Sequence, residues 1–278
     1  MPDSTPLPDQ TPTPGSGQHG PPPPKELLAP NEGKQRVIDV GGQQWARIPL
    51  QTHAFAAGED FAALIADYVS AAMEPILADP ELAPGLARPW YVVSSEKIIA
   101  IAQGRSYFLW DIKPGWWART LSRFVVKLPT GIGLGTPWTM QLAIQEAGLP
   151  RILVAAGASA VGKLLGKRGW FYRVAGHNVN AIDGPAETNV YPANVSAKLA
   201  PKDPDRASGQ IRRAIVAVVP EDIGGRLSGV TIIDANDLGR NVLGQDSDRD
   251  DEFFAALFAD NPAGQGRQQT PVTLCLQV

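Results

Sequence analysis

The sequence predicts an α+β protein in which helices combine with mixed or antiparallel sheets. Its 278 residues are 44% hydrophobic and 19% charged, which is enough apolar material for one large core or two modest ones. Short apolar runs alternate as half-buried strands do, whereas other segments carry apolar residues at helical spacing. Both kinds of segment occur along the whole chain, and no internal repeat is present.

The first segment, residues 1–33, is rich in proline and includes the run Pro21–Pro24. Such a stretch buries too little apolar surface to offset its ordering entropy, so we expect a disordered tail with polyproline II character. It lacks the basic start, apolar run and small-residue cleavage site of a secretory signal. The folded domain is expected over residues 34–278.

Two strands, a helix and two further apolar elements are expected next. The strands are at residues 36–40 and 45–50. Glu59 and Asp60 open a strongly amphipathic helix with apolar side chains from Phe61 to Met73 at helical spacing. Residues 90–93 then form a buried strand, and an apolar element at residues 97–103 ends at Gly104.

The run from Leu128 to Gln145 contains no charged residue. Its prolines and glycines would leave backbone groups unpaired in lipid, so we expect a loop that enters a helix at residues 138–147 rather than a membrane span. Further strands are expected at residues 151–156, 215–219, 229–233 and 270–278.

The overall charge gives no reason to expect nucleic acid or an anionic membrane as a partner. The formal net charge is -3 and the pI is about 5.7, whereas such partners usually require a clustered basic face. Cys275 is the single cysteine, which excludes a disulfide framework and a cysteine metal site and suits a cytoplasmic setting. The three histidines share no metal-ligand spacing, so a bound metal would take oxygen ligands.

The segment Gly157–Lys163 matches a phosphate-binding loop, in which glycines let backbone amides surround phosphate oxygens. The next residue is Leu164, where such a loop needs Ser or Thr to hold magnesium. A tightly packed helix with outward-pointing basic residues explains the same pattern equally well, and Leu164 argues against the phosphate loop.

Asp183 and Asp234 each follow an apolar run, where a strand end delivers a side chain to a cleft. Two such carboxylates and an amide oxygen, such as that of Gln245, make a hard oxygen set suited to Mg²⁺ or Mn²⁺. The remaining ligands of these ions are usually water and nucleotide phosphates. In the alternative interpretation, Asp183 and Asp237 are turn or cap residues.

Several segments, taken in order, resemble the coenzyme F420-0:gamma-glutamyl ligase family from about Ile48 to the C-terminus. Lys97 to Arg105 resembles the family's Lys-Ile-Val-Ser-Lys-Ala-Glu-Gly-Arg, and Ala200 to Asp205 resembles its Leu-Pro-x-Asp-Pro-Asp. The other matching segments are Ile48–Leu50, Ala57–Asp60, Asn180–Asp183, Asn194–Val195, Ile233–Asp234, Gly239–Arg240 and Gly244–Asp246. Their shared order over most of the chain makes the resemblance specific.

The resemblance implies that residues 34–278 form one F420-0:gamma-glutamyl ligase-like domain and an interlocked homodimer. It also implies a GTP-dependent (or ATP-dependent) ligase that uses Mg²⁺ or Mn²⁺ to join an amino acid, in this family L-glutamate, to a carboxylate substrate through an acyl phosphate. The implied metal ligands are Asp183, Asp234 and Gln245. The implied nucleotide or phosphate contacts are Lys97, Arg105, Asn194 and Arg240. No catalytic residue is assigned.

The sequence also departs from the family. The family's Ser, second Lys and Glu in the first motif align with Ala100, Ile101 and Gln103, and a Thr after the second aspartate aligns with Ala235. The preferred function is therefore an amide ligase with altered phosphate and glutamate contacts. A non-catalytic nucleotide- or cofactor-binding protein is the alternative, and a phosphate-loop kinase or NTPase is a weaker third.

Overall fold

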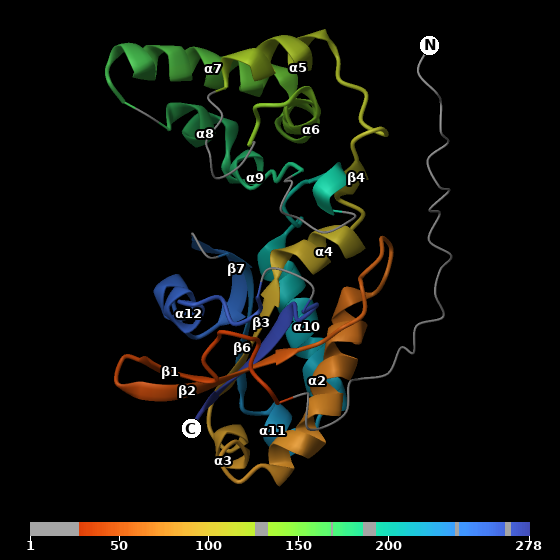
Figure 1. Cartoon of the computed structure of the whole chain (residues 1–278), viewed down its shortest axis with the longest axis vertical. Coiled ribbons are helices and arrows are strands. Elements are labelled where there is room, and N and C mark those ends of the chain that lie inside the picture. The colour runs from red at the N-terminus through yellow and green to blue at the C-terminus, as the bar shows by residue number, and fades with distance from the viewer. Residues whose placement is uncertain (1–27, 126–132, 168, 186–192, 237–238, 265–267) are drawn as a thin grey trace, which may run out of the picture.

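The computed structural model of the chain describes residues 28–125, 133–167, 169–185, 193–236, 239–264 and 268–278. Figure 1 shows two parts along the longest axis: a β-sheet with helices on both faces, and a group of helices beyond one end of it. We call these the sheet part and the helical part. The predicted α+β class is confirmed.

Six strands form the main sheet in the order β1, β2, β8, β3, β6, β7. Their bounds are Val37–Val40 (β1), Gln43–Leu50 (β2), Trp90–Ser95 (β3), Leu227–Ala235 (β6), Arg240–Ser247 (β7) and Val272–Gln277 (β8). β3 and β6 are parallel, and the other neighbouring strands are antiparallel. The mixed sheet and the predicted strands at 36–40, 45–50, 90–93, 229–233 and 270–278 are confirmed.

Two long helices, α2 (Phe61–Ala78) and α10 (Pro204–Val218), cover one face of this sheet and form the largest core with it. α2 begins where predicted, because the Asp60 carboxylate accepts hydrogen bonds from the amides of Ala62 and Ala63. Among the described residues, α2 alone has the length and hydropathy of a membrane span. Its buried side chains pack in the core of the sheet part.

A second core lies on the opposite face of the sheet, beneath α12 (Asp251–Leu257). Its rings pack edge to face: the Tyr91 and Phe254 centroids are 5.7 Å apart with an interplanar angle of 80°. Cys275 is fully buried here, which raises the pKa of its thiol to about 12. The short helices of the sheet part are α3 (Ala83–Leu86), α4 (Glu96–Ala102) and α11 (Glu221–Gly224).

The chain leaves the sheet part after α4 and returns to it before α10, and the segment between them has its own core. Its described elements are β4 (Ser106–Phe108), α5 (Trp116–Leu121), the 3-10 helix η1 (Ser122–Phe124), α6 (Pro137–Ala147), α7 (Leu149–Leu164), α8 (Trp170–Ala175), α9 (His177–Asn180), the 3-10 helix η2 (Ala193–Val195) and β5 (Ser196–Lys198). β4 and β5 pair as a small antiparallel sheet. The helix predicted at residues 138–147 is α6.

Two predicted strands are helices instead. Residues 151–156 lie in α7, which has Pro150 near its first turn and buries Ile152, Ala155 and Gly162 on one face. The run of large apolar residues resembled a strand, but the small residues after it continue the helical spacing.

The predicted strand at residues 215–219 is mostly the last turn of α10, which ends before Pro220. The buried residues Ala207, Ile211 and Ile215 recur every four positions along this helix and face the sheet. Of the apolar residues in the last turn of α10, 215–218, only Ile215 is buried, as expected for a helix with one buried face.

The segment Gly157–Lys163 lies inside α7, so it is not a phosphate-binding loop, and the packed-helix interpretation is confirmed. A Cβ atom at Gly162 would lie 2.9 Å from the backbone oxygen of Lys167 and 3.1 Å from the Trp170 ring. This glycine therefore allows the chain to turn closely from α7 toward α8.

Residues just before the predicted domain boundary at Gly33 pack on the sheet part. Leu28 contacts the main core, and the Asn31 side chain donates to the Pro262 carbonyl (2.7 Å) and to Thr270 Oγ1 (2.9 Å). The folded unit thus begins earlier than the sequence predicts. Residues 1–27, residues 128–132 of the predicted loop, and Asp237 lie outside the described residues.

Candidate active site

Three segments that are far apart in the sequence meet where the helical part joins the sheet part. The first is the start of α4, where the Ser95 hydroxyl accepts a hydrogen bond from the Lys97 amide (3.3 Å). The second is a bridge between Asp183 and Lys198, whose backbones exchange two hydrogen bonds of 2.9 and 2.8 Å. The third is the end of β6 at Asp234, beside the end of β3.

A buried ion pair between Glu96 and Lys198 lies at the centre of this junction. Each side chain is only 8% exposed, and the Lys198 ammonium group donates to Glu96 Oε1. Glu96 Oε2 is also buried, and it has no hydrogen-bond partner in the described part of the chain. A buried charge is costly when unpaired, so each partner depends on the other.

The surroundings of Lys198 keep it charged. Burial acts to lower the pKa of its ammonium group, but nearby carboxylates outweigh burial and raise this pKa. Those carboxylates belong to Glu96, Asp183 and Asp234. Burial by itself raises the pKa of Glu96, but we expect the ion pair to persist because Glu96 faces the ammonium groups of both Lys198 and Lys97.

Lys97 belongs to the same group of charges. Burial of its ammonium group, and then the positive charge of Lys198, lower its pKa, while Asp183, Glu96 and Asp234 oppose that change. Solvent reaches part of this side chain, which limits the size of the effect. The structure therefore brings the predicted residues Lys97, Asp183 and Asp234 into one electrostatic neighbourhood.

Asp183 and Asp234 are both exposed, and their carboxylates form no hydrogen bond or ion pair with any described residue. Asp183 does not follow a strand, as the sequence suggested, but a short helix, α9. It is placed by its backbone bridge to Lys198. Asp234 lies near the end of β6, as predicted. Both carboxylates are thus available for a ligand.

These groups suit a divalent cation with a phosphate-bearing ligand. Among the described residues, no three His, Cys, Asp or Glu side chains are arranged to hold a metal. A cation between Asp183 and Asp234 would therefore complete its shell with water and phosphate oxygens, which is typical of Mg²⁺. The ammonium group of the exposed Lys97, which is in the same electrostatic neighbourhood as both carboxylates, would then be available to the phosphate oxygens, whereas Lys198 is buried against Glu96.

Gln245, the third predicted metal ligand, lies elsewhere. Its amide group donates to Asp251 of α12 (2.7 Å), and its Oε1 atom is buried without a partner in the described part of the chain. Gln245 is paired with Thr231, so the alternation of β6 places it on the α12 face, whereas Asp234 follows Ile232 on the α10 face. The structure does not bring Gln245 to the two aspartates.

Two predicted nucleotide contacts hold the fold together. The Arg105 guanidinium donates to the Ala200 carbonyl and pairs with Glu146 at 2.9 Å. The Arg240 guanidinium donates to the carbonyls of Phe258 (3.0 Å) and Ala259, at the end of α12. Both are thus engaged within the protein.

The predicted contact Asn194 is exposed in η2, four residues before Lys198. η2 directly precedes β5, the strand that ends with the junction residue Lys198. A nucleotide-binding role for Asn194 stays a prediction.

Segments that carry the family resemblance meet in space. The Asp205 carboxylate accepts a hydrogen bond from the backbone N–H of Gln245 (2.9 Å), and a Cβ atom at Gly244 would lie 2.6 Å from the backbone nitrogen of Asp205. Only glycine allows this approach of β7 to the start of α10. The Gln103 side chain likewise exchanges hydrogen bonds of 3.0 and 2.6 Å with the Lys202 backbone.

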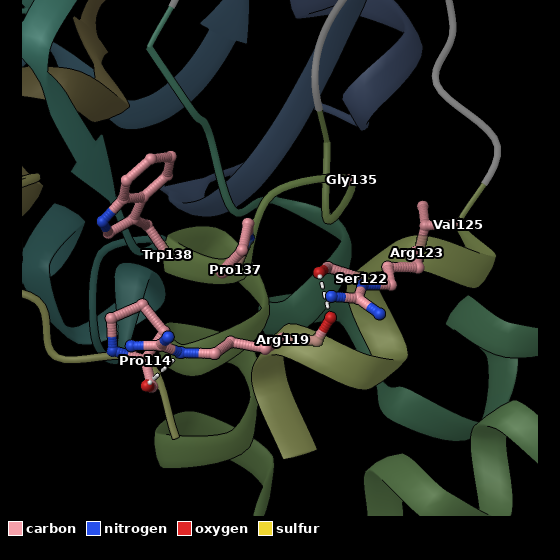
Figure 2. A pocket seen from close by; sticks show the side chains of 8 residues that line it. All are labelled: Pro114, Arg119, Ser122, Arg123, Val125, Gly135, Pro137 and Trp138. Carbon is pink, nitrogen blue, oxygen red and sulfur yellow. Dashed lines mark hydrogen bonds between the residues drawn. The ribbon is translucent and has the colours of Figure 1, made fainter. Parts of the chain in front are cut away.

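A separate hollow of about 840 Å³ lies in the helical part (Figure 2). It is lined by Pro114, Arg119, Ser122, Arg123, Val125, Gly135, Pro137 and Trp138. One lining guanidinium, that of Arg119, is turned toward the Pro114 carbonyl (3.1 Å). None of the site residues predicted from the sequence lines this hollow.

The comparisons with known proteins add no family. No protein family model matches this chain, and a search of the curated proteins found no match. The resemblance to F420-0:gamma-glutamyl ligases therefore depends on the segments quoted above.

Glu96 and Lys198 were missed by the sequence analysis. Only Lys198 carried a signal, as a single charge that precedes the apolar Leu199 and Ala200, whereas Glu96 is followed directly by Lys97. A lone charge in such a setting is expected to be paired when it is buried, and this expectation points to the ion pair.

Proposed function

We propose that this protein is a nucleotide- and divalent-metal-dependent amide ligase that acts on a carboxylate substrate. The observation that supports it best is the meeting of Lys97, Asp183 and Asp234 at one junction, together with the buried Lys198. Free carboxylates beside ammonium groups suit a complex of a metal cation with a nucleoside triphosphate better than they suit the cation or the triphosphate alone. The carboxylates would bind the cation, and the ammonium groups would attract the phosphates.

The reaction follows from the chemistry of the substrate. A carboxylate is a poor electrophile, so its oxygen first attacks the terminal phosphorus of GTP or ATP, and the nucleoside diphosphate leaves. An amine, for which we propose that of L-glutamate, then attacks the acyl carbon, loses a proton and displaces phosphate. Asp183 and Asp234 would hold Mg²⁺ or Mn²⁺, which offsets charge on the phosphoryl oxygens.

The lysines have separate proposed roles. Lys97 is partly exposed and would contact the transferred phosphoryl group directly. Lys198 is fixed by Glu96 and would supply a constant positive field behind it. We also propose the homodimer that the resemblance implies.

A second candidate is a binding protein without ligase chemistry. It is favoured by the position of Ala100, which is fully buried where the family has Ser, so no side chain at this position reaches the site. Ile101 packs on the core where the family has Lys. In its nucleotide-binding form, the second candidate shares metal-dependent nucleotide binding with the first, and only the first predicts turnover.

Calorimetry with GTP and with ATP, in Mn²⁺ or in EDTA, tests the shared step. We expect binding in Mn²⁺ that EDTA abolishes. Turnover is tested with coenzyme F420-0 and other carboxylates in the presence of hydroxylamine, which traps an acyl phosphate as a hydroxamate. Metal-dependent binding without hydroxamate or amide product would favour the binding protein. Nucleotide binding that is equal in Mn²⁺ and in EDTA would refute both the ligase and the metal-dependent nucleotide-binding protein.

A further inference from the structure

The outermost helix of the helical part exposes an apolar stripe. Figure 1 shows α7 at the end of the longest axis, with α6 and α8 between it and the sheet part. Val154, Val161 and Leu165 recur at intervals of seven and four residues, on the side opposite the buried Ile152. Leu164, on the same outward side, is 87% exposed. This stripe therefore points away from the rest of the molecule.

Aromatic side chains are exposed at the same end of the molecule. Trp116 and Trp117 begin α5, and they are 67% and 41% exposed. Phe124, at the end of η1, is 74% exposed. It lies between Arg123 and Val125, which line the hollow in Figure 2. The exposed rings of α5 and η1 and the apolar face of α7 thus lie at the same end of the long axis (Figure 1), and we call α5, η1 and α7 together the outer layer.

The charge of this region is opposite to that of the whole chain. Residues 105–185 contain ten lysines and arginines but only three aspartates and glutamates. The other residues contain fifteen basic and twenty-five acidic side chains. Of the three acidic residues, Glu146 is paired with Arg105 and Asp183 lies at the junction. Within the outer layer itself, α5, η1 and α7 carry Arg119, Arg123, Arg151 and Lys163 and no acidic residue, so the layer is basic although the net charge of the protein is -3.

We propose that the outer layer of α5, η1 and α7 docks on an anionic lipid bilayer. Lysine and arginine side chains would attract the acidic headgroups, while the tryptophan, phenylalanine and leucine side chains enter the interface. Positive charge alone would also suit nucleic acid. The aliphatic stripe of Val154, Val161 and Leu165 favours lipid, because such side chains offer no stacking surface to a base.

The location of the layer supports the same partner. A bilayer presents an extended surface, so it could contact α5 and α7 at the same time, because both helices lie at one end of the long axis (Figure 1). The junction with Lys97 and Asp234 lies at the other side of the helical part and would stay open to solution. This inference does not depend on the proposed ligase function.

Co-sedimentation with lipid vesicles tests the proposal. The full chain should pellet with vesicles of phosphatidylcholine and phosphatidylglycerol in equal amounts, and it should remain in solution with phosphatidylcholine alone. The tryptophan fluorescence of the chain, to which the exposed Trp116 and Trp117 contribute, should shift to shorter wavelength in the bound state. High salt should weaken the binding, because charged headgroups are screened.

Two variants separate charge from apolar contact. Arg123→Glu with Lys163→Glu should lower the partition coefficient by roughly tenfold or more, since each basic side chain near the surface adds to the attraction. Phe124→Ser with Leu164→Ser should also lower it. The matched controls are Arg213→Glu with Arg226→Glu, and Leu77→Ser with Val216→Ser, which change exposed residues of the sheet part. These controls should bind as the parent does.

Several results would overturn the proposal. One is equal binding of the parent and Arg123→Glu/Lys163→Glu to anionic vesicles when circular dichroism shows that both are folded. Another is a parent that ignores vesicles but binds single-stranded RNA through the same residues. A third is a parent oligomer that Phe124→Ser/Leu164→Ser converts to monomer, because the layer would then be an interface between copies of the chain.

Discussion

The ammonium group of Lys198 bonds the carboxylate of Glu96 across 102 positions of the chain, and both groups are buried. Glu96 is the first residue of α4, and Lys198 is the last residue of β5. The pair therefore joins the helical part to the sheet part. It also fixes the start of the helix that carries Lys97, so the geometry of the candidate site depends on it.

We expect the Glu96–Lys198 pair to be sensitive to the loss of one partner. Glu96→Leu or Lys198→Met leaves a buried group without its counterpart, which should lower the free energy of unfolding by about 3–5 kcal/mol. The double variant Glu96→Leu/Lys198→Met should recover much of this loss. Urea unfolding of the two single variants and the double variant measures the coupling.

The more exposed pair Arg36–Asp79, with an N–O distance of 2.8 Å, is the matched control for that cycle. Arg36→Met should change stability by only about 0–1 kcal/mol, because solvent screens the pair. Equal losses at the two pairs would mean that Glu96–Lys198 is not buried in solution as it is here.

Asp183→Asn and Asp234→Asn should each abolish the effect of Mn²⁺ on nucleotide binding. The neutral amide keeps the size of the side chain but removes the charge that a hard cation requires. Calorimetry with GTP in Mn²⁺ measures the loss, and thermal unfolding should show little change because both side chains are exposed. Asp67→Asn, at an exposed position on α2, is the control and should bind as the parent does. Unchanged Mn²⁺-dependent binding in both site variants would disprove the metal assignment.

Lys97→Met should separate the phosphate contact from the metal contact. The loss of a charged donor to phosphate should weaken GTP binding by about tenfold or more. Mn²⁺ alone should bind more tightly, because a like charge beside Asp183 and Asp234 has been removed. Titration of each variant with Mn²⁺, and then with GTP at saturating Mn²⁺, distinguishes the two effects. A parallel loss of both affinities would instead indicate a damaged site.

The structure places two of the three predicted metal ligands, Asp183 and Asp234, at one junction but not Gln245, for a physical reason. Asp183 and Asp234 end up together because one is bridged to Lys198 and the other ends β6, next to β3. The order of segments along a sequence does not determine on which face of a strand a side chain lies. Gln245 pairs with Thr231, which lies three residues before Asp234 in β6 and on the other side of a register shift, and it faces α12. One such step in register is enough to move a side chain to the other face.

The predicted elements failed where local composition and tertiary packing disagreed. Residues 151–156 and 215–219 are runs of large apolar residues, which suit a buried strand as well as a helix. In each case residues outside the run show that it is helical. Gly162 continues the buried side of α7, and α10 starts at Asp203 and Pro204, well before residue 215. The basic character of residues 105–185 was visible in the sequence, but the overall net charge of -3 hides it.

Asp260 should make the protein sensitive to acid. Partial burial acts to raise the pKa of its carboxyl group, but hydrogen bonds from Arg47 and the Gln35 amide outweigh burial and lower it below 3.8. The unfolded chain therefore takes up this proton at a higher pH than the folded protein does. The stabilisation is complete above the unfolded value and is lost as the pH falls below about 4.

Urea unfolding between pH 6 and about pH 3 tests this linkage. The parent should lose more stability over that range than Asp260→Asn, which has no proton to take up at this position. Arg47 is buried beside Asp260, so the variant should also be less stable at neutral pH. Parallel stability curves for the two proteins would show that Asp260 does not contribute to the acid sensitivity.

Deletion of residues 1–27 should leave both the fold and the proposed homodimer intact. A proline-rich segment buries little apolar surface, so it adds little to a subunit interface. The contacts that anchor the N-terminal end of the folded unit begin with Leu28, and the hydrogen bonds of Asn31 to Pro262 and Thr270 lie outside the deletion. Deletion of residues 1–33 removes those contacts, so it should lower the stability of the subunit as well.

Light scattering across a dilution series, combined with urea unfolding, compares the two truncations with the full chain. Obligate dimers dissociate as they unfold, so a folded monomer of the shorter truncation at high concentration would contradict the proposed homodimer without touching the metal assignment.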